Sequence, residues 1–229
     1  MNIAIILAGG TGTRLGGDIP KQYLEVGGKP VIGYCLDTCF DSDEISAVHV
    51  VADQQWREFI ESHLPKENRQ KWKGFSQPGE TRQLSIWNAL VDIGAYADAE
   101  DAVFIHDAAR PLLSVELLNR CLQSVKRHDG VLPVLPMKDT VYYSEDGSKV
   151  SGLLKRSSVY AGQAPEAFHF GKYYEANRTL FPDKIKQING STEPAIMAGL
   201  DIVMIDGEES NFKITTQADL QRFQQIIEK

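Results

Sequence analysis

Residues 4–16 have the sequence Ala4-Ile5-Ile6-Leu7-Ala8-Gly9-Gly10-Thr11-Gly12-Thr13-Arg14-Leu15-Gly16, and Pro20-Lys21-Gln22 follows soon after. An apolar run breaks here into glycines and then presents two cations, Arg14 and Lys21. Glycine lets backbone N–H groups approach phosphate oxygens closely, and the cations neutralise their charge. The stretch therefore predicts a buried strand that ends in an anion-binding loop.

The rest of the chain alternates strand-like and helix-like segments. Apolar runs predict strands at 2–8, 45–52, 102–105, 130–136, 201–205 and 211–214. Helical spacing or a capping residue predicts helices at 30–40, 54–64, 81–94 and 114–127, and from 192 and 216 onward, whereas residues 66–75 look irregular. This order predicts an α/β, Rossmann-like fold: a mostly parallel twisted sheet with helices on both faces.

Ligands of such a fold bind at the carboxyl ends of the strands. The glycine loop, Asp107 and the run Lys138-Asp139-Thr140 all follow predicted strands directly. We therefore expect the site to form at this edge of the sheet.

Residues 138–160 interrupt the alternation. Val141-Tyr142-Tyr143 and residues 150–154 flank a turn at Glu145-Asp146-Gly147, which is typical of a β-hairpin. A lone hairpin is too small to fold by itself. We therefore predict that residues 1–229 form a single domain and that this hairpin is an arm that leans on another subunit.

The amino-acid composition excludes several classes of partner and of site. The net charge of −7 argues against nucleic acid as the main partner, which would favour a basic face. The chain contains no apolar run long enough to span a membrane and no signal-peptide pattern, so we expect a cytoplasmic protein without a membrane partner. Cys35, Cys39 and Cys121 are odd in number and lie in apolar settings, which favours buried free thiols over a redox or zinc site.

The glycine spacing excludes two common nucleotide loops. A Walker loop needs G-x-x-x-x-G-K-[ST], and no such run occurs. A dinucleotide fingerprint needs a third glycine where this chain has Leu15, and the acidic residue expected about 20 residues later is missing. These spacings argue against a dinucleotide-dependent oxidoreductase, and the lysines Lys21 and Lys213 argue against a non-catalytic nucleotide-binding protein.

Several motifs in register resemble a known family. Residues 7–16 with Pro20-Lys21-Gln22-Tyr23-Leu24 are similar to the opening of nucleotidyltransferases that join a nucleotide to a sugar or polyol phosphate. Gly79-Glu80-Thr81-Arg82, His106-Asp107-Ala108-Ala109-Arg110-Pro111, Asp139-Thr140, Arg156, Gln163-x-Pro165 and Asn211-Phe212-Lys213-Ile214-Thr215-Thr216 follow in the expected order. The chain thus resembles the cytidylyltransferase branch, which includes the enzymes for 2-C-methyl-D-erythritol 4-phosphate and for ribitol 5-phosphate.

The resemblance implies that CTP and a polyol phosphate react to give a CDP-polyol and pyrophosphate, with methylerythritol 4-phosphate as the leading acceptor and ribitol 5-phosphate as the alternative. It implies catalysis by Arg14, Lys21 and Lys213. It implies CTP binding by Leu7, Ala8, Gly9, Gly10, Thr11, Gly12, Gly79, Glu80, Ser85, Asp107 and Ala108. Acceptor binding would fall to Asp107, Thr140, Arg156 and Thr192, with the arm crossing to a partner in a homodimer.

Magnesium is implied as well, because triphosphates are normally handled as metal complexes with few protein ligands. The resemblance puts Asp107 near the ribose or near the metal.

Plainer interpretations stay open for several of these residues. His106 is more often a hydrogen-bonded structural histidine than a base, since the attacking phosphate is already ionised. Arg82 and Arg110 are equally compatible with structural ion pairs. The methylerythritol enzymes usually have Gln-Thr-Pro-Gln where this chain has Gln163-Ala164-Pro165-Glu166, and Thr-Asp-Asp where it has Thr192-Glu193-Pro194. These departures leave the acceptor open.

Overall fold

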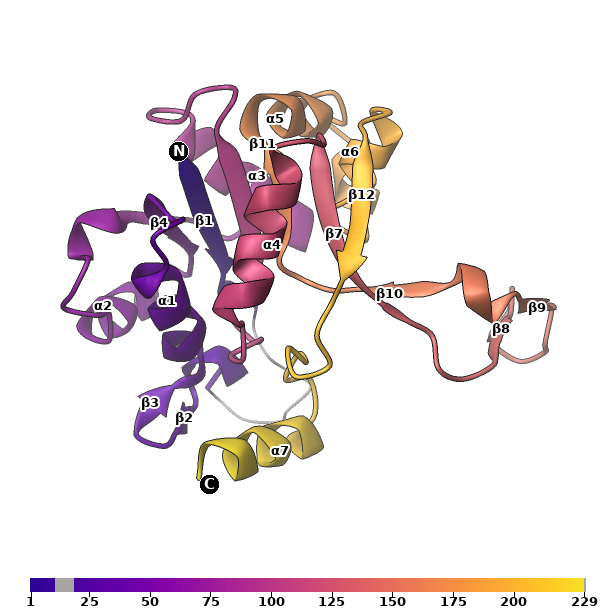
Figure 1. Cartoon of the computed structure of the whole chain (residues 1–229), viewed down its shortest axis with the longest axis horizontal. Helices are drawn as coiled ribbons and strands as arrows, with labels where there is room; N and C mark the ends of the chain where they lie inside the picture. Colours follow the sequence, from indigo (N-terminus) through magenta and orange to yellow (C-terminus); the bar gives the residue numbers. More distant parts are fainter. Residues whose placement is uncertain (11–18, 229) are drawn as a thin grey trace.

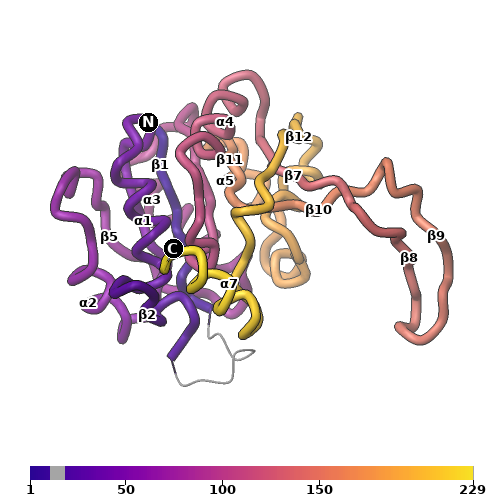
Figure 2. Tube along the Cα trace, turned by 60° about the horizontal axis from the view of Figure 1, so that its bottom comes forward, coloured from indigo at the N-terminus to yellow at the C-terminus, as the bar shows by residue number. Residues whose placement is uncertain are grey.

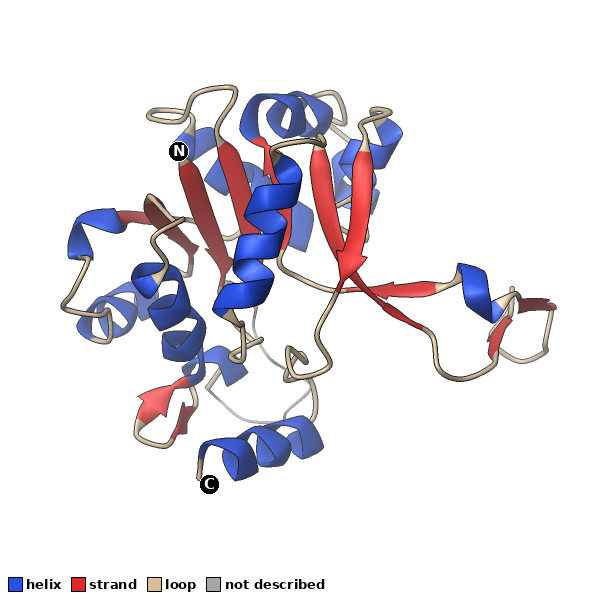
Figure 3. Cartoon of the chain, viewed as in Figure 1, coloured by secondary structure: helices blue, strands red, loops and turns tan. Residues whose placement is uncertain are grey.

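The computed structural model describes residues 1–10 and 19–228, and its centre is a twisted eight-stranded sheet (Figures 1 and 3). The strand order is β10-β7-β11-β6-β1-β4-β5. Strand β7 pairs with β10 near its end and with β11 near its start, and β12 is its third partner. The strands are β1 (Asn2–Leu7), β4 (Ala47–Val51), β5 (Trp72–Ser76), β6 (Ala102–Asp107), β7 (Gly130–Pro136), β10 (Tyr160–Gly162), β11 (Glu166–His169) and β12 (Ile202–Asp206). Only β10 and β11 run antiparallel to their neighbours.

The first strand lies in the middle of the parallel part. Strand β1 pairs with β4 on one side and β6 on the other, so Ile5 stands opposite both His49 and Ile105. Residues 3–6 are fully buried. Two flanking strands and helices on both faces explain why the run is apolar at every position rather than at alternate ones.

Helices cover both faces of the sheet (Figure 3). One face packs against α1 (Val31–Asp41), α2 (Gln54–Ser62) and α4 (Val115–Val125). The opposite face packs against α3 (Arg82–Ile93), α5 (Phe170–Arg178) and α6 (Glu193–Met197). The predicted α/β class is confirmed, and Cys35, Cys39 and Cys121 are buried free thiols as expected. No helix in the described part of the chain is long and apolar enough to cross a membrane.

The last helix closes the edge of the sheet where the strands end. Helix α7 (Gln217–Ile227) starts with a capping box, in which Thr216 and Asp219 satisfy each other's backbone N–H groups. Its residues Leu220 and Phe223 are buried with Val26 from the small hairpin of β2 (Glu25–Val26) and β3 (Lys29–Pro30). Figures 1 and 2 show α7 lying across the carboxyl-end side of the sheet.

Several segments differ from the sequence prediction, which also missed α5, β10 and the hairpin of β2 and β3. Residues 66–75 contain a 3-10 turn (Arg69–Lys71) and most of β5, an edge strand whose charged and half-buried residues hide its pattern. Strand β11 runs antiparallel between β6 and β7, a pairing that apolar periodicity cannot reveal. The predicted strand at 211–214 is wrong: this segment is irregular and joins the body through single hydrogen bonds, such as that from Ile214 N to Ala109 O (2.8 Å).

The predicted hairpin is present as an arm. Strands β8 (Val141–Tyr143) and β9 (Gly152–Leu154) pair only with each other, and a 3-10 turn (Arg156–Ser158) leads back to β10. The arm projects from the body in both views (Figures 1 and 2). It exposes large apolar side chains, with Tyr142 60% and Leu153 64% exposed.

The difference in burial predicts that a buried and an exposed isoleucine contribute differently to stability. Ile105→Ala should lower the free energy of unfolding by about 2–5 kcal/mol, because it leaves a cavity at a fully buried position. Ile196→Ala, at a residue that is 63% exposed, should change it by less than about 0.5 kcal/mol. Urea unfolding measures both values, and equal effects would contradict the assigned core.

Candidate active site

A cleft of about 420 Å³ opens where β1 and β6 end. It brings together nine residues named from the sequence: Leu7, Gly9, Gly10, Lys21, Gly79, Glu80, Ser85, Asp107 and Lys213. It also takes in Gln22, Thr81, Arg82 and Ala109. Residues from both ends of the chain therefore share one cavity.

Other predicted residues lie elsewhere. Ala8 and Ala108 are buried and do not line the cleft. Thr192 is buried, and its Oγ1 has no hydrogen-bond partner among the described residues. Thr140 and Arg156 are exposed on the arm, where Arg156 Nη1 donates to Lys138 O (3.0 Å).

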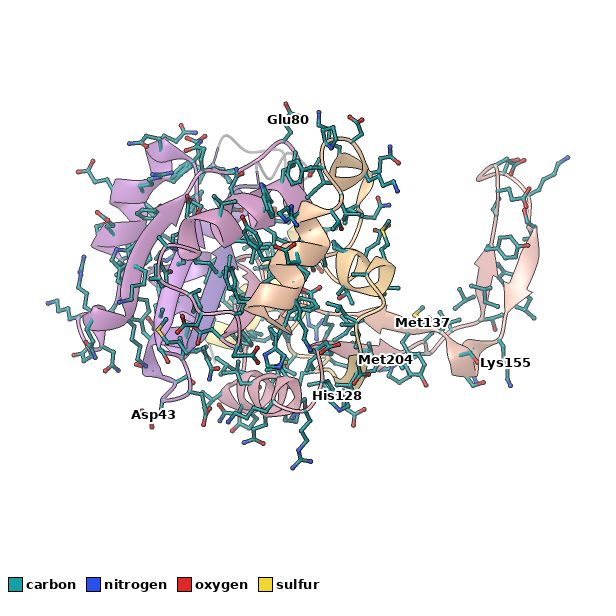
Figure 4. The ribbon with its side chains drawn as sticks, turned by 90° about the horizontal axis from the view of Figure 1, so that it is seen from above. Asp43, Glu80, His128, Met137, Lys155 and Met204 are labelled. Carbon is teal, nitrogen blue, oxygen red and sulfur yellow. The ribbon has the colours of Figure 1, made fainter. Side chains whose placement is uncertain are left out.

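Figure 4 shows Lys155, the neighbour of Arg156, on the arm well away from Glu80 at the rim of the body. The structure does not bring the arm residues to the cleft of their own chain. Thr11, Gly12 and Arg14 fall outside the described residues.

Gln22 fixes the start of the glycine loop. Its Nε2 donates to Ala8 O (2.6 Å) and to Gly10 O (2.7 Å), and the Tyr23 hydroxyl also donates to Ala8 O (2.9 Å). Both residues lie in a 3-10 turn (Lys21–Tyr23) that follows Pro20. The turn puts Lys21 into the cleft, although only 8% of this residue is exposed. Gln22 belongs to the motif seen in the sequence, but the sequence alone indicated no role for it.

Two glycines let neighbouring loops approach each other. A Cβ on Gly9 would lie 2.6 Å from the Pro78 ring, and a Cβ on Gly79 would lie 2.4 Å from Leu84 Cβ. The Ser85 hydroxyl accepts from Gly79 N (3.0 Å) and donates to Thr81 O (3.0 Å), so it holds the loop that begins α3. The wall of the cleft is therefore built largely from fixed backbone.

Asp107 pairs with three cations at the edge of the cleft. Its Oδ1 accepts from Arg82 Nη2 (3.0 Å) and Nε (3.2 Å), and its Oδ2 lies 2.9 Å from Lys213 Nζ. Arg110 Nε is 3.7 Å from the same oxygen. Burial alone would raise the pKa of Asp107, but these cations outweigh it and lower that pKa well below its usual range.

A second buried carboxylate stands behind Arg82. Arg82 Nη1 donates to Ser191 Oγ (2.7 Å), Ser191 Oγ donates to Glu166 Oε1, and Glu166 Oε2 lies 3.6 Å from Arg82 Nη2. Burial raises the pKa of Glu166, although Arg82 opposes the shift. Sequence reasoning treated Glu166 only as a departure from a motif. A charged residue within the apolar strand β11 was the signal that could have identified it.

His106 has a structural environment. Its Nε2 lies 2.9 Å from Arg110 O, to which the protonated nitrogen donates, and burial lowers its pKa to about 4. The ring is thus neutral near neutral pH and occupied by the backbone. This geometry favours the structural interpretation of His106 over a role as a base.

The described side chains offer no preformed metal cage. Among the described residues, no group of three or more His, Cys, Asp and Glu side chains could hold a metal ion. Asp107, the expected metal neighbour, is already surrounded by cations. Within the part of the chain that the structure describes, the side chains therefore form no group that could hold a metal ion by themselves.

The contacts of two adjacent glycines predict that alanine destabilises the fold at one position and not at the other. Gly9→Ala should lower the free energy of unfolding by about 1–3 kcal/mol, because the added methyl group overlaps Pro78. Gly10→Ala, whose Cβ would meet no atom of the described residues within 4 Å, should change it by less than about 0.5 kcal/mol. Thermal unfolding of the two variants checks this contrast, and equal destabilisation would refute the close approach.

The Asp107 cluster predicts a pH-dependent stability. Asp107→Asn should lower the free energy of unfolding by about 3 kcal/mol near pH 7, because the cations lose their counter-charge. The pKa of Asp107 is lowered in the folded state, so its contribution is complete above the unfolded-state value of about 4 and is lost as the pH falls below it.

Urea unfolding across a pH series, with the exposed Asp43→Asn as control, measures this contribution. The difference between Asp107→Asn and the unaltered chain should stay constant above about pH 5 and shrink in stronger acid. A difference that grew on acidification would contradict the assigned ion pairs.

Comparisons with known proteins agree with this architecture. The family model described as "IspD: 2-C-methyl-D-erythritol 4-phosphate cytidylyltransferase" matches residues 2–229. A ribitol-5-phosphate cytidylyltransferase of Streptococcus agalactiae is 32% identical over 229 residues, covering 100% of this chain and 95% of the relative. A 2-C-methyl-D-erythritol 4-phosphate cytidylyltransferase of Clostridium beijerinckii is 30% identical over 217 residues, covering 95% and 94%.

A solved structure gives the same result for the fold. The 4-diphosphocytidyl-2C-methyl-D-erythritol synthase of Anaerococcus prevotii superimposes with a TM-score of 0.83 at 25% identity, covering 100% of this chain and 96% of that one. Motifs, cleft and comparisons converge, and the chain belongs to the IspD family of cytidylyltransferases, which are nucleotidyltransferases.

Proposed function

We propose that the chain transfers a cytidylyl group from CTP to a polyol phosphate, giving a CDP-polyol and pyrophosphate. One observation carries the proposal: Lys21 and Lys213, which are far apart in sequence, line one cleft beside the backbone of Gly9 and Gly10. A triphosphate needs such a combination of backbone donors and cations. Family membership supplies the transfer chemistry.

The CTP would lie with its triphosphate along the glycine loop. Leu7, Gly9 and Gly10 supply the cleft wall at the end of β1, with Lys21 beside them. Thr11, Gly12 and Arg14 would complete the loop. The base would face the second loop, where the backbone of Gly79 and Glu80 adjoins the fixed Ser85 hydroxyl.

The acceptor phosphate would attack the α-phosphorus in line with the leaving pyrophosphate. It is already ionised, so no side chain has to remove a proton. Negative charge develops on the equatorial and leaving oxygens, where Lys21, Lys213 and Arg14 would stabilise it. Asp107, paired with Arg82 and Lys213, would orient the lysine and limit the positive charge.

The proposal includes a magnesium ion that would bind together with the triphosphate. Bound there, Mg²⁺ neutralises phosphate charge while keeping most of its water ligands. Asp107, which pairs with Arg82 and Lys213, would be the protein carboxylate nearest to the ion.

Two acceptors remain candidates, each supported by an observation. Methylerythritol 4-phosphate is the leading one, because the family model for that activity spans residues 2–229. Ribitol 5-phosphate is the second, because relatives with that name are 31–33% identical. Thr192, whose Oγ1 is buried without a hydrogen-bond partner among the described residues, would bind either acceptor if that acceptor reaches beyond the cleft wall.

The arm would complete the site of a second copy. Thr140 and Arg156 are exposed far from the cleft of their own chain, and the arm around them carries unburied apolar side chains. A homodimer in which each arm covers the partner would bury these side chains and deliver Arg156 to the partner's acceptor.

The transferase proposal predicts a nucleotide- and acceptor-dependent release of pyrophosphate. The chain should release it with CTP plus one of the two polyol phosphates, and Lys21→Ala or Lys213→Ala should reduce kcat by about 10²–10³-fold. Lys66→Ala, at an exposed lysine outside the cleft, serves as the control. If no pyrophosphate is released with either acceptor and any nucleoside triphosphate, the proposal is refuted.

Shared sites predict complementation between inactive chains. Arg156→Ala and Lys21→Ala chains, mixed in equal amounts and allowed to exchange subunits, should regain up to about a quarter of the activity, since about half of the dimers are mixed and one of the two sites in a mixed dimer keeps both residues. Activity of the mixture against each variant alone is the measurement. No recovery despite exchange would show that the arm serves its own chain or none.

A further inference from the structure

Lys213 lies on a segment that has no regular secondary structure. Strand β12 ends at Asp206 and α7 begins at Gln217, so residues 207–216 lack both a ladder and a helix. Yet Lys213 Nζ sits 2.9 Å from Asp107 Oδ2 and lines the cleft. Irregular segments are the most mobile parts of a fold, whereas a reacting group must be held to within about 0.5 Å. Something outside the segment has to fix it.

Gln163 supplies the first tie. Its side-chain Nε2 donates to Glu208 O (3.0 Å), and its Oε1 accepts from Glu208 N (3.0 Å). The amide thus replaces the peptide of a neighbouring strand at the point where β12 leaves β7. Gln163 is only 6% exposed, and Gly207 leaves it room, since a Cβ there would lie 2.5 Å from Oε1.

Asn211 supplies the second tie. This residue is fully buried, its Nδ2 donates to Ala164 O (2.8 Å), and its backbone carbonyl accepts from Arg110 Nη1 (2.7 Å). On the other side of Lys213, Ile214 N donates to Ala109 O (2.8 Å). Lys213 is therefore held from both sides, and Asn211 provides the hold on the amino-terminal side.

Both ties reach the same place in the fold. Gln163 and Ala164 directly follow β10, the strand by which the arm rejoins the sheet. We propose that Gln163 and Asn211 are positioning residues, a brace that fixes the Lys213 segment to the root of the arm. The inference rests on the proposed function, because it gives Lys213 a task at the phosphates. It further implies that the placement of Lys213 depends on the placement of the arm root.

The brace predicts an effect on turnover rather than on nucleotide affinity. Gln163→Met keeps the length of the side chain and removes both hydrogen bonds to Glu208. We expect kcat to fall by about 10–100-fold with KM for CTP within about twofold, because misplacing a reacting group by about 1 Å costs up to about 10²-fold. The exposed Gln187→Met is the matched control and should leave both constants unchanged.

A double-mutant cycle separates positioning from general damage. In a Lys213→Ala background, Gln163→Met should lower kcat by less than about threefold further, because the group it positions is already absent. Full multiplication of the two effects, or an unchanged kcat in folded Gln163→Met, would overturn the brace. If Gln163→Met does not fold, Gln163→Glu, which keeps the acceptor for Glu208 N–H, is used in the same cycle.

Failure of the proposed function has a different signature. In that case the unaltered chain transfers no cytidylyl group to either polyol phosphate, and the brace falls with it. Failure of the brace alone leaves that transfer intact and makes the two substitutions independent.

Discussion

The ion pairs of Asp107 with Arg82 and Lys213 join three distant parts of the chain. Asp107 ends β6, Arg82 opens α3, and Lys213 lies on the irregular segment before α7. A buried carboxylate is tolerated at the end of a strand only with such partners. Its charge in turn keeps neighbouring cations from repelling one another. Asp107 and, behind Arg82, Glu166 thus balance the positive charge on this side of the cleft.

The walls of the cleft are fixed by hydrogen bonds from side chains to the backbone and by close backbone approach. Gln22 binds both carbonyls that flank Gly9, and Gly9 lies directly against Pro78. Ser85 holds the opposite loop in the same manner. Backbone donors prearranged in this way need little reorganisation when charge develops on a bound phosphate. The cations then add their positive charge to a backbone arrangement that is already in place.

The sequence was most informative where local chemistry dominates. The apolar run at 2–8, the Thr216 cap and the hairpin around Gly147 were all predictable from short-range patterns. It was least informative at strands β5 and β11, because an exposed edge strand and an antiparallel insertion depend on partners far along the chain. The strand expected at 211–214 failed for a related reason: apolar residues there, such as Ile214, pack beneath α7 without pairing in a sheet.

By itself, the sequence determined the α/β alternation, which follows from residue types at short spacings, and the family, which its motifs resemble. It also predicted a phosphate-binding first loop. It also named Lys21, Asp107 and Lys213. Only the tertiary structure decided that Arg82 and Glu166 stand behind Asp107, and that Gln163 and Asn211 tie down the Lys213 segment. Those contacts join side chains that are distant along the chain, and such pairings arise only when the sheet brings its strand ends together.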